Sequence, residues 1–513
     1  MPRNLPVTSS VGRMPRLFWP LLVALTLASV VLTACNRPPE ETTDADVYKI
    51  RIDQDGIYRI PLDAFKGLPA DEFNTERLSL TRRDEAVPFA VTGAGKDRAL
   101  YFYGETRIDQ YAAYDYYWLR RREPGKSTLA TITPAAHLAT RAVQPAAATP
   151  ALTTVASSRL AEDKLYLPKL PAAGDHWLWA QLSAPTAMTV TLPVQNMVDI
   201  SQTLHVTLWT ITETAENPDH HAVIYVNGQS VYDETWDGRN LQEIVAPLPK
   251  GLIREGQNQV TLSLPGDTGA IIDTVALEAV QLDYTQTVSA QEDRASWWAP
   301  EGEHDFGVNG FGSSDVQVWD VTQPDNPAQL TGYVAEKEGA SYAVRFADNA
   351  TGARHYIAAT PRAMLHTADV TPWRGSGLPT PAEGADYIVI AYPKFVDALK
   401  PLVEKRQADG LRVVVATTDQ IYDAFSNGRP EPQGIKDFLY AAYRNWPSPA
   451  PRFVLLVGDA SYDYRDVLQG KFKDLVPTYL LDTTYVGETA SDNWFVRFGS
   501  DPEDYRPSLA IGR

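Results

Sequence analysis

The cysteine and histidine residues, which could supply a thiol nucleophile and an imidazole base, are few, and none lies in the last quarter of the chain. Cys35 is the single cysteine, and the eight histidines all precede Ala385. Attack by a thiolate requires a nearby imidazole, because the thiol proton must be taken up and later returned to the leaving group. The segment after Ala385 holds neither group, so no catalytic residue is predicted within this chain.

Two adjacent histidines beside an aspartate raise the question of a metal site. They are His220 and His221, preceded by Asp219. In a strand, neighbouring side chains point to opposite faces, so the two imidazoles could bind one ion only at a turn. We therefore expect a solvated loop here and leave the metal content of the protein open.

Six aspartates follow the apolar segments of the C-terminal quarter: Asp459, Asp463, Asp466, Asp492, Asp501 and Asp504. Calcium prefers several oxygen ligands, so these carboxylates could hold it, although their spacing matches no known calcium loop. No cofactor is required by the sequence. Asp459 could equally cap the turn or helix that follows it, and this is the simpler interpretation.

The N-terminus predicts export. Arg3, Arg13 and Arg16 precede an uncharged apolar segment that ends in Leu-Thr-Ala-Cys at Cys35. This ending resembles the lipobox of bacterial lipoproteins, and the only cysteine occupies the position that becomes lipidated. The prediction is a signal peptide over 1–34, a lipid anchor at Cys35 and a location in the cell envelope or at the cell surface. The alternative is an uncleaved transmembrane anchor with an incidental cysteine.

Composition indicates a multidomain globular protein. The 513 residues are 44% hydrophobic and 21% charged, with a formal charge of -18 from 46 basic and 64 acidic side chains. No cluster of Lys and Arg interrupts this acidity, which argues against nucleic acid as a partner.

The elements that would position a site are in the C-terminal segment, 379–513. Apolar runs at 386–391, 411–416 and 453–457 predict strands buried on both faces. Helical stripes after Pro393 and around Phe438 separate them, so a βαβαβ unit with a parallel sheet is expected. The third strand leads into Gly458 and Asp459, at the edge where open α/β sheets place their sites.

The same segment resembles the gingipain-type cysteine peptidases. The resemblance rests on "RFVLLVGDASYDY", "VPTYL", "ETASDNWF" and "LAIGR", which follow "DYIVIAYPKF" in the order of that family. It implies a caspase-like α/β domain whose His and Cys dyad is carried on later strands, beyond Arg513. We therefore expect 379–513 to be the N-terminal, truncated part of such a domain.

β-rich domains are expected before it. Strand alternation predicts a small β domain at 47–128, which begins with a hairpin turning at Asp55 and Gly56, a β-sandwich at 161–286 and a further β segment at 287–378. Composition predicts a tether at 35–46 and an Ala/Thr/Pro-rich linker at 129–160. The sandwich resembles the galactose-binding-like jelly roll, some members of which bind carbohydrate.

Three functions are compatible with this organisation. The first is an exported, membrane-anchored cysteine-type endopeptidase acting on proteins or peptides. The second is a sortase-like transpeptidase of a secretion system, an activity found in some relatives. The third is a surface binding protein in which the jelly roll binds carbohydrate and the peptidase-like domain is inactive.

Overall fold

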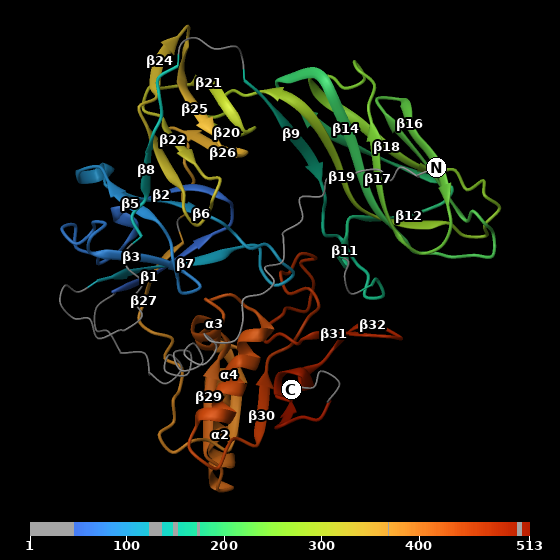
Figure 1. Ribbon diagram of the computed structural model, residues 1–513. Coiled ribbons are helices and arrows are strands. Elements are labelled where there is room, and N and C mark those ends of the chain that lie inside the picture. The colour runs from blue at the N-terminus through green and yellow to red at the C-terminus, as the bar shows by residue number, and fades with distance from the viewer. Residues whose placement is uncertain (1–45, 123–135, 147–151, 172–174, 368, 500–504) are drawn as a thin grey trace, which may run out of the picture. The chain divides into compact units, whose positions relative to one another are not determined.

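The computed structural model describes residues 46–122, 136–146, 152–171, 175–367, 369–499 and 505–513. All of them belong to one compact unit, Glu41–Arg513. The predicted signal peptide and most of the tether, including Cys35, lie outside the described residues. Within these ranges no helix has both the length and the apolar character needed to cross a membrane. Strands dominate as far as β27 and the α-helices follow, which confirms the predicted order of β-rich domains and an α/β domain (Figure 1).

Two small sheets around a shared apolar core form the first β domain. Their strand orders are β27-β1-β7-β3-β4 and β2-β6-β5. Tyr48, Ile50 and Ile52 are buried in the core between them, because alternate residues of a strand face the same side. The strands are β1 Val47–Ile52, β2 Gly56–Pro61, β3 Leu78–Arg82, β4 Glu85–Ala86, β5 Phe89–Thr92, β6 Ala99–Gly104, β7 Asp115–Arg121 and β27 Val370–Trp373.

The predicted hairpin between β1 and β2 is wrong. β1 pairs with β7 and β27, whereas β2 pairs with β6 in the other sheet. Gly56 has φ +152°, and a Cβ there would lie 2.8 Å from Leu365. The turn therefore carries the chain from one sheet to the other, and alternation alone could not reveal this because both strands have the same pattern.

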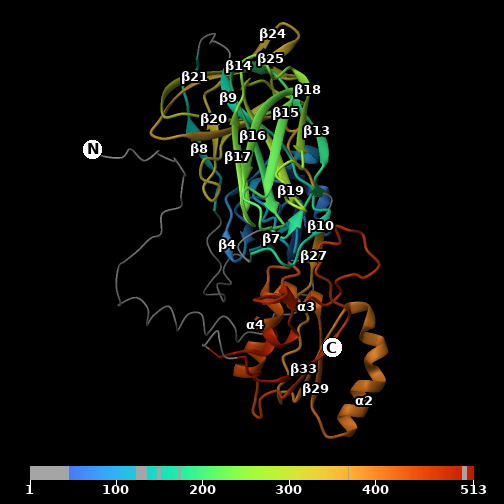
Figure 2. The same ribbon diagram turned by 90° about the vertical axis from the view of Figure 1, so that its right-hand side faces the viewer.

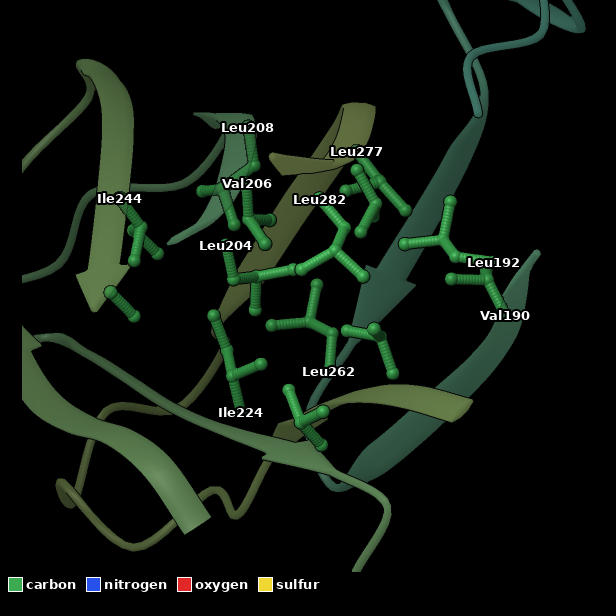
Figure 3. Close-up of a cluster of buried hydrophobic side chains, with 14 of the residues drawn as sticks. Val190, Leu192, Leu204, Val206, Leu208, Ile224, Ile244, Leu262, Leu277 and Leu282 are labelled. Atoms are coloured by element: carbon green, nitrogen blue, oxygen red, sulfur yellow. The ribbon is translucent and has the colours of Figure 1, made fainter. Parts of the chain in front are cut away.

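Two antiparallel sheets packed face to face make the predicted β-sandwich. One has the order β12-β19-β14-β17 with β9 also paired to β19, and the other has the order β13-β18-β15-β16. Leucine, isoleucine and valine side chains from both sheets meet in the core (Figure 3). The strands are β9 Thr153–Leu160, β12 Ala180–Ser183, β13 Thr186–Val194, β14 Met197–Thr210, β15 His220–Val226, β16 Gln229–Trp236, β17 Leu241–Pro247, β18 Gly256–Leu264 and β19 Thr274–Thr287.

The predicted linker at 129–160 contains two strands. β8, Ala139–Ala142, pairs in parallel with β23, and β9 pairs with the last half of β19. Residues of β9 alternate between exposed and half-buried, and on its inner face only Ala156 and Leu160 pack against the apolar core. The position of β9 is therefore determined mainly by backbone pairing with the long strand β19 and less by its side-chain pattern.

A second pair of sheets follows the sandwich. Their orders are β20-β26-β22-β23-β8 and β21-β25-β24, and Trp297, Phe306, Phe346 and Tyr356 form the aromatic centre of their core. The strands are β20 Arg294–Ala299, β21 Gly302–Phe311, β22 Gln317–Asp320, β23 Ala328–Thr331, β24 Val334–Glu338, β25 Ser341–Ala350 and β26 Arg354–Ala359.

The C-terminal domain is a parallel sheet with helices on both faces (Figure 2). Its strand order is β29-β28-β30-β33. The strands are β28 Tyr387–Ala391, β29 Val413–Thr417, β30 Phe453–Val457 and β33 Ala510–Gly512, and the helices are η3 Pro393–Leu399, α2 Lys400–Ala408, α3 Thr418–Phe425 and α4 Pro432–Asn445. The predicted parallel α/β sheet is thus confirmed, with an additional short helix, α3, that begins at a capping box formed by Thr417 and Gln420.

Alternate residues of the inner strand β28 pack against helices on opposite faces of the sheet. Ile388 and Ile390 pack with α3 and α4, whereas Val389 and Ala391 pack with η3 and α2. A strand that is buried on both faces reads as a continuous apolar run, as the sequence of β28 does.

The turn between α3 and α4 is buried against the first β domain. Arg429 is 0% exposed. Its Nη2 donates to Asp109 Oδ2 at 2.7 Å, and its Nε donates to Glu431 Oε1 at 2.6 Å. Its Nη1 donates to the carbonyl of Arg107 at 2.8 Å. Two residues earlier, the Asn427 side chain accepts from Trp118 Nε1 at 2.6 Å. The α/β domain is therefore joined to the first β domain by polar contacts, not only by the chain connection.

The expected solvated loop at His220 and His221 is wrong, because both residues lie in β15. His220 is 0% exposed and contacts Asp273 Oδ1 through Nδ1 at 2.7 Å and the carbonyl of Thr212 through Nε2 at 3.0 Å. His221 instead contacts Asp267 and Asp233. The two imidazoles do point to different partners, as expected for neighbours in a strand, and each has both ring nitrogens engaged by protein groups.

Candidate active-site cleft

A sharp turn follows β30 at the carboxyl edge of the sheet. Gly458 has φ +151°, and a Cβ there would lie 2.8 Å from Val476. The amides of Leu475 and Val476 donate to the carbonyl of Asp459 at 2.9 and 3.1 Å, so the loop that starts at Asp459 returns to its own beginning. Glycine is needed here because the returning chain passes directly over the turn.

Carboxylates inside this loop hold its shape. Asp463 is buried and accepts from the amides of Val467 and Leu468 at 2.8 Å each. Asp474 accepts from the amide of Ser461 at 2.9 Å. The loop is thus ordered by hydrogen bonds from its own backbone rather than by an apolar core.

Asp474 has a perturbed acidity. Burial raises the pKa of its carboxyl to about 7; the Ser461 amide and the charge of Arg513 oppose this, and the charge of Asp463 adds to it. A folded-state pKa above the unfolded value of about 3.9 means that its contribution to stability is full below about pH 4 and is lost as the pH rises through 7.

Replacing Asp474 with Asn should remove this dependence. We expect the thermal midpoint of Asp474→Asn to exceed that of the wild type by about 5 °C at pH 8, and to show no gain at pH 4, measured by scanning calorimetry. Asp397→Asn is the matched control, because the Asp397 side chain is 92% exposed. Equal responses of the two variants to pH would contradict the assignment.

The Arg513 side chain connects three segments at the carboxyl edge of the parallel sheet. Its Nε and Nη2 donate to both oxygens of Asp492 at 2.9 and 2.6 Å. Its Nη1 also donates to the carbonyl of Gly458 at 2.8 Å, and Nη2 donates to that of Pro477 at 3.1 Å. This bidentate pair fixes the start of η4, Asp492–Val496, against the turn after β30.

A cleft of about 930 Å³ opens at this edge. Asp459, Ala460, Ser461 and Tyr462 line it from the loop after β30, and Asp492 and Arg513 from the pair just described. The hairpin of β31, Leu480–Thr483, and β32, Gly487–Ala490, contributes further lining. Its volume lies at the upper end of the range for ligand sites, and its place at the carboxyl ends of parallel strands is where α/β proteins bind ligands.

One wall of the cleft comes from the sandwich side of the chain, which the sequence did not indicate. Tyr166 and Pro168 line the cleft and belong to the hairpin of β10, Leu165–Tyr166, and β11, Trp177–Leu178. The Tyr166 ring stacks on Tyr462 with centroids 4.6 Å apart at 18°, and its hydroxyl donates to Glu488. The alternation of Trp177 and Trp179 predicts a strand here, but a pairing of two residues on each strand gives no sign that the hairpin reaches the cleft.

The six aspartates considered for calcium do not form one site among the described residues. Asp492 pairs with Arg513, Asp466 with Lys473, and Asp463 caps its own loop. Across the part of the chain that the structure describes, no group of three or more His, Cys, Asp or Glu side chains is arranged to hold a metal ion. Asp501 and Asp504 lie outside the described residues.

One histidine, His176, belongs to the hairpin that forms this wall. Its Nδ1 contacts the carbonyl of Leu167 at 2.9 Å and lies 3.6 Å from Glu488 Oε2. It is 7% exposed, and the described residues include no cysteine, since Cys35 is the only one in the sequence and lies outside them. The described cleft therefore offers binding groups and carboxylates but no thiol.

The chain was compared with protein-family models, curated proteins and solved structures. Residues 380–513 match the family model described as Peptidase family C25. None of the curated proteins matches the chain.

Among solved structures, the chain is similar to dimeric latent PorU from Porphyromonas gingivalis, with a TM-score of 0.63 and 15% identity over 95% of this chain. The match covers 49% of that chain, so the present chain spans about half its length. A β-porphyranase from Bacteroides plebeius matches 48% of this chain and 37% of its own at 9% identity, with a TM-score of 0.18, too low to indicate a shared fold.

Proposed function

We propose that the chain is part of an exported, membrane-anchored cysteine peptidase that cleaves proteins or peptides, because residues 380–513 match the model of peptidase family C25. The observation that carries the proposal is the coincidence of the family match with the cleft at the carboxyl edge of the parallel sheet. In α/β folds, loops at this edge bind the substrate.

The chemistry in this proposal is acyl transfer through a thiol. Residues 380–513 contain neither cysteine nor histidine, so in this proposal the nucleophile and its base come from residues outside this segment. The present residues would bind and orient the polypeptide. Gly458 and Arg513 fix the turn against which the reacting groups would be placed.

The test is thiol-dependent hydrolysis by the full-length protein. A mixed peptide library should be cleaved, and prior alkylation of the protein with iodoacetamide should abolish cleavage. A Cys35→Ser background excludes alkylation at the anchor. Cleavage that survives alkylation in this background would overturn a cysteine mechanism.

The proposed membrane anchor depends on lipidation of Cys35, which can be tested separately. Wild-type protein grown with a labelled fatty acid should become labelled and partition with membranes, whereas Cys35→Ser should lose both properties. The physical reason is that each buried methylene of an acyl chain contributes about 0.8 kcal/mol to membrane binding. Equal labelling of the two proteins would remove the lipoprotein interpretation.

A further inference from the structure

We propose that the stacked pair of Tyr166 and Tyr462 forms a specificity-determining shelf that selects an apolar side chain of the polypeptide bound in the cleft. The inference rests on the proposed function, because it assumes that the cleft receives a polypeptide. It adds a substrate preference contributed by the region before the α/β domain.

The shelf presents aromatic surface to the cleft. Tyr462 is 44% exposed although it stacks on Tyr166, and Trp177 packs against Tyr166 with ring centroids 5.3 Å apart. Phe472, which is 68% exposed, lines the same cleft. Exposed aromatic rings grouped in a concave site are typical of binding surfaces, since each ring loses contact with water when a ligand covers it.

The shelf is held rigidly from both sides. Leu178 and Leu170, on the hairpin side, are buried with Trp209 of the sandwich. On the other side, the amide of Glu488 donates to the carbonyl of Pro168 at 2.8 Å. Gly487, at φ +75°, lies so close that a Cβ would overlap this carbonyl. A preorganised aromatic surface discriminates between side chains better than a mobile one, because little ordering is required when a ligand binds.

The charges of the lining indicate which side chains are excluded. Three carboxylates, Asp459, Glu488 and Asp492, face one guanidinium, Arg513. Asp492 is paired with Arg513 and Glu488 accepts from Tyr166, whereas Asp459 is exposed. This excess of negative charge disfavours acidic side chains, and the aromatic surface itself favours aliphatic and aromatic ones.

The strand edge beside the shelf suits an extended backbone. Leu480 of β31 lines the cleft, and among the described strands β31 pairs only with β32. An extended segment added to such an edge directs alternate side chains to the same face, so one of them can reach the shelf.

The experiment measures side-chain preference by binding, without any need for catalysis. Three fluorescein-labelled hexapeptides of Gly, Ala and Asn, which differ only in a central Phe, Ser or Glu, are titrated with the 513-residue chain and followed by fluorescence anisotropy. We expect the Phe peptide to bind about tenfold more tightly than the Ser peptide, and the Glu peptide to bind most weakly.

Variants then assign the preference to the shelf. Tyr462→Ala and Tyr166→Ala should each reduce the Phe over Ser ratio to below about threefold, whereas Tyr166→Phe, which keeps the ring, should retain it. Tyr225→Ala, on the distant strand β15 and 36% exposed, is the matched control. Should Tyr166→Ala fail to fold, Tyr462→Ala still tests the proposal, because the Tyr462 side chain is partly exposed.

The outcomes separate this inference from the proposed function. A wild type without Phe preference, or a preference unchanged in Tyr462→Ala, overturns the shelf even if the full-length protein cleaves peptides. A preference that depends on the shelf, in a full-length protein that cleaves nothing, supports the shelf and rejects only the peptidase activity.

Discussion

Under the proposed function, in which the thiol and the imidazole come from outside this chain, the 513-residue chain by itself should show no thiol-dependent hydrolysis of peptides, because loss of such a pair costs on the order of a millionfold in turnover. The reason is chemical. Acyl transfer loses its nucleophile and its base together when no thiol and imidazole lie within hydrogen-bond reach of each other. Residues 380–513 provide neither group, and Cys35 lies outside the described residues.

Other groups at the cleft cannot replace this pair. His176 uses Nδ1 in a hydrogen bond to the Leu167 carbonyl, and it is 7% exposed. Ser461 lies in the cleft lining, but its amide is bound to Asp474 and no imidazole contacts its hydroxyl among the described residues. A serine without a base has a high pKa and is a poor nucleophile.

The measurement compares the chain with the full-length protein on one mixed peptide library, each with and without iodoacetamide. Inhibitor-sensitive cleavage by the 513-residue chain would contradict the prediction, because alkylation could then act only at Cys35. The same comparison in Cys35→Ser shows whether any residual cleavage comes from a contaminating enzyme.

The sequence predicted the elements whose local pattern is strong. The strand expected at 453–457 is β30 with the same bounds, Phe453–Val457, and the strand expected at 386–391 differs from β28 by one residue. Both are continuous apolar runs, and such runs can be recognised without knowledge of the rest of the chain. β28 is buried on both faces, whereas β30 is buried on one face and half-buried or exposed on the other.

Features that depend on distant partners were not predictable in the same way. β1 and β2 have the alternation of a hairpin, yet they join different sheets because their partners, β27 and β6, come from later in the chain. β9 has a weak apolar pattern, and it pairs with the part of β19 that β12 leaves open on that edge. The pattern of a segment records which faces are buried, whereas pairing depends on which backbone lies alongside.

The two sides of the cleft differ in the same way: one follows from a local sequence pattern, and the other depends on residues far away in the sequence. The Gly458 turn and the position of Asp459 follow from the end of a buried strand and were expected. The wall that includes Tyr166 is separated from Tyr462 by almost three hundred positions of sequence, and its hairpin pairs only two residues on each strand. Short elements of this kind are positioned by tertiary contacts, so only the structure identifies them.

The second large effect is expected at Arg429. Replacing it with Met should lower the free energy of unfolding by about 3 kcal/mol, measured by urea denaturation of the chain. The substitution removes a buried charge and the hydrogen bonds that Arg429 donates to Asp109, Glu431 and the carbonyl of Arg107. Uncompensated buried charges of this kind cost about 3–5 kcal/mol, and the lower value is expected because Arg107 also contacts Asp109, at 2.9 Å, and Glu431, at 3.3 Å.

A matched control separates the loss of this contact from the loss of an arginine. Arg444 lies on the exposed side of α4, so Arg444→Met should change the free energy of unfolding by less than about 0.5 kcal/mol. If Arg429→Met is as stable as Arg444→Met, the contacts between the α3–α4 turn and the first β domain do not stabilise the chain. If it loses the expected 3 kcal/mol, the first β domain supports the α/β domain directly, and the edge that carries the cleft depends on residues more than three hundred positions before it.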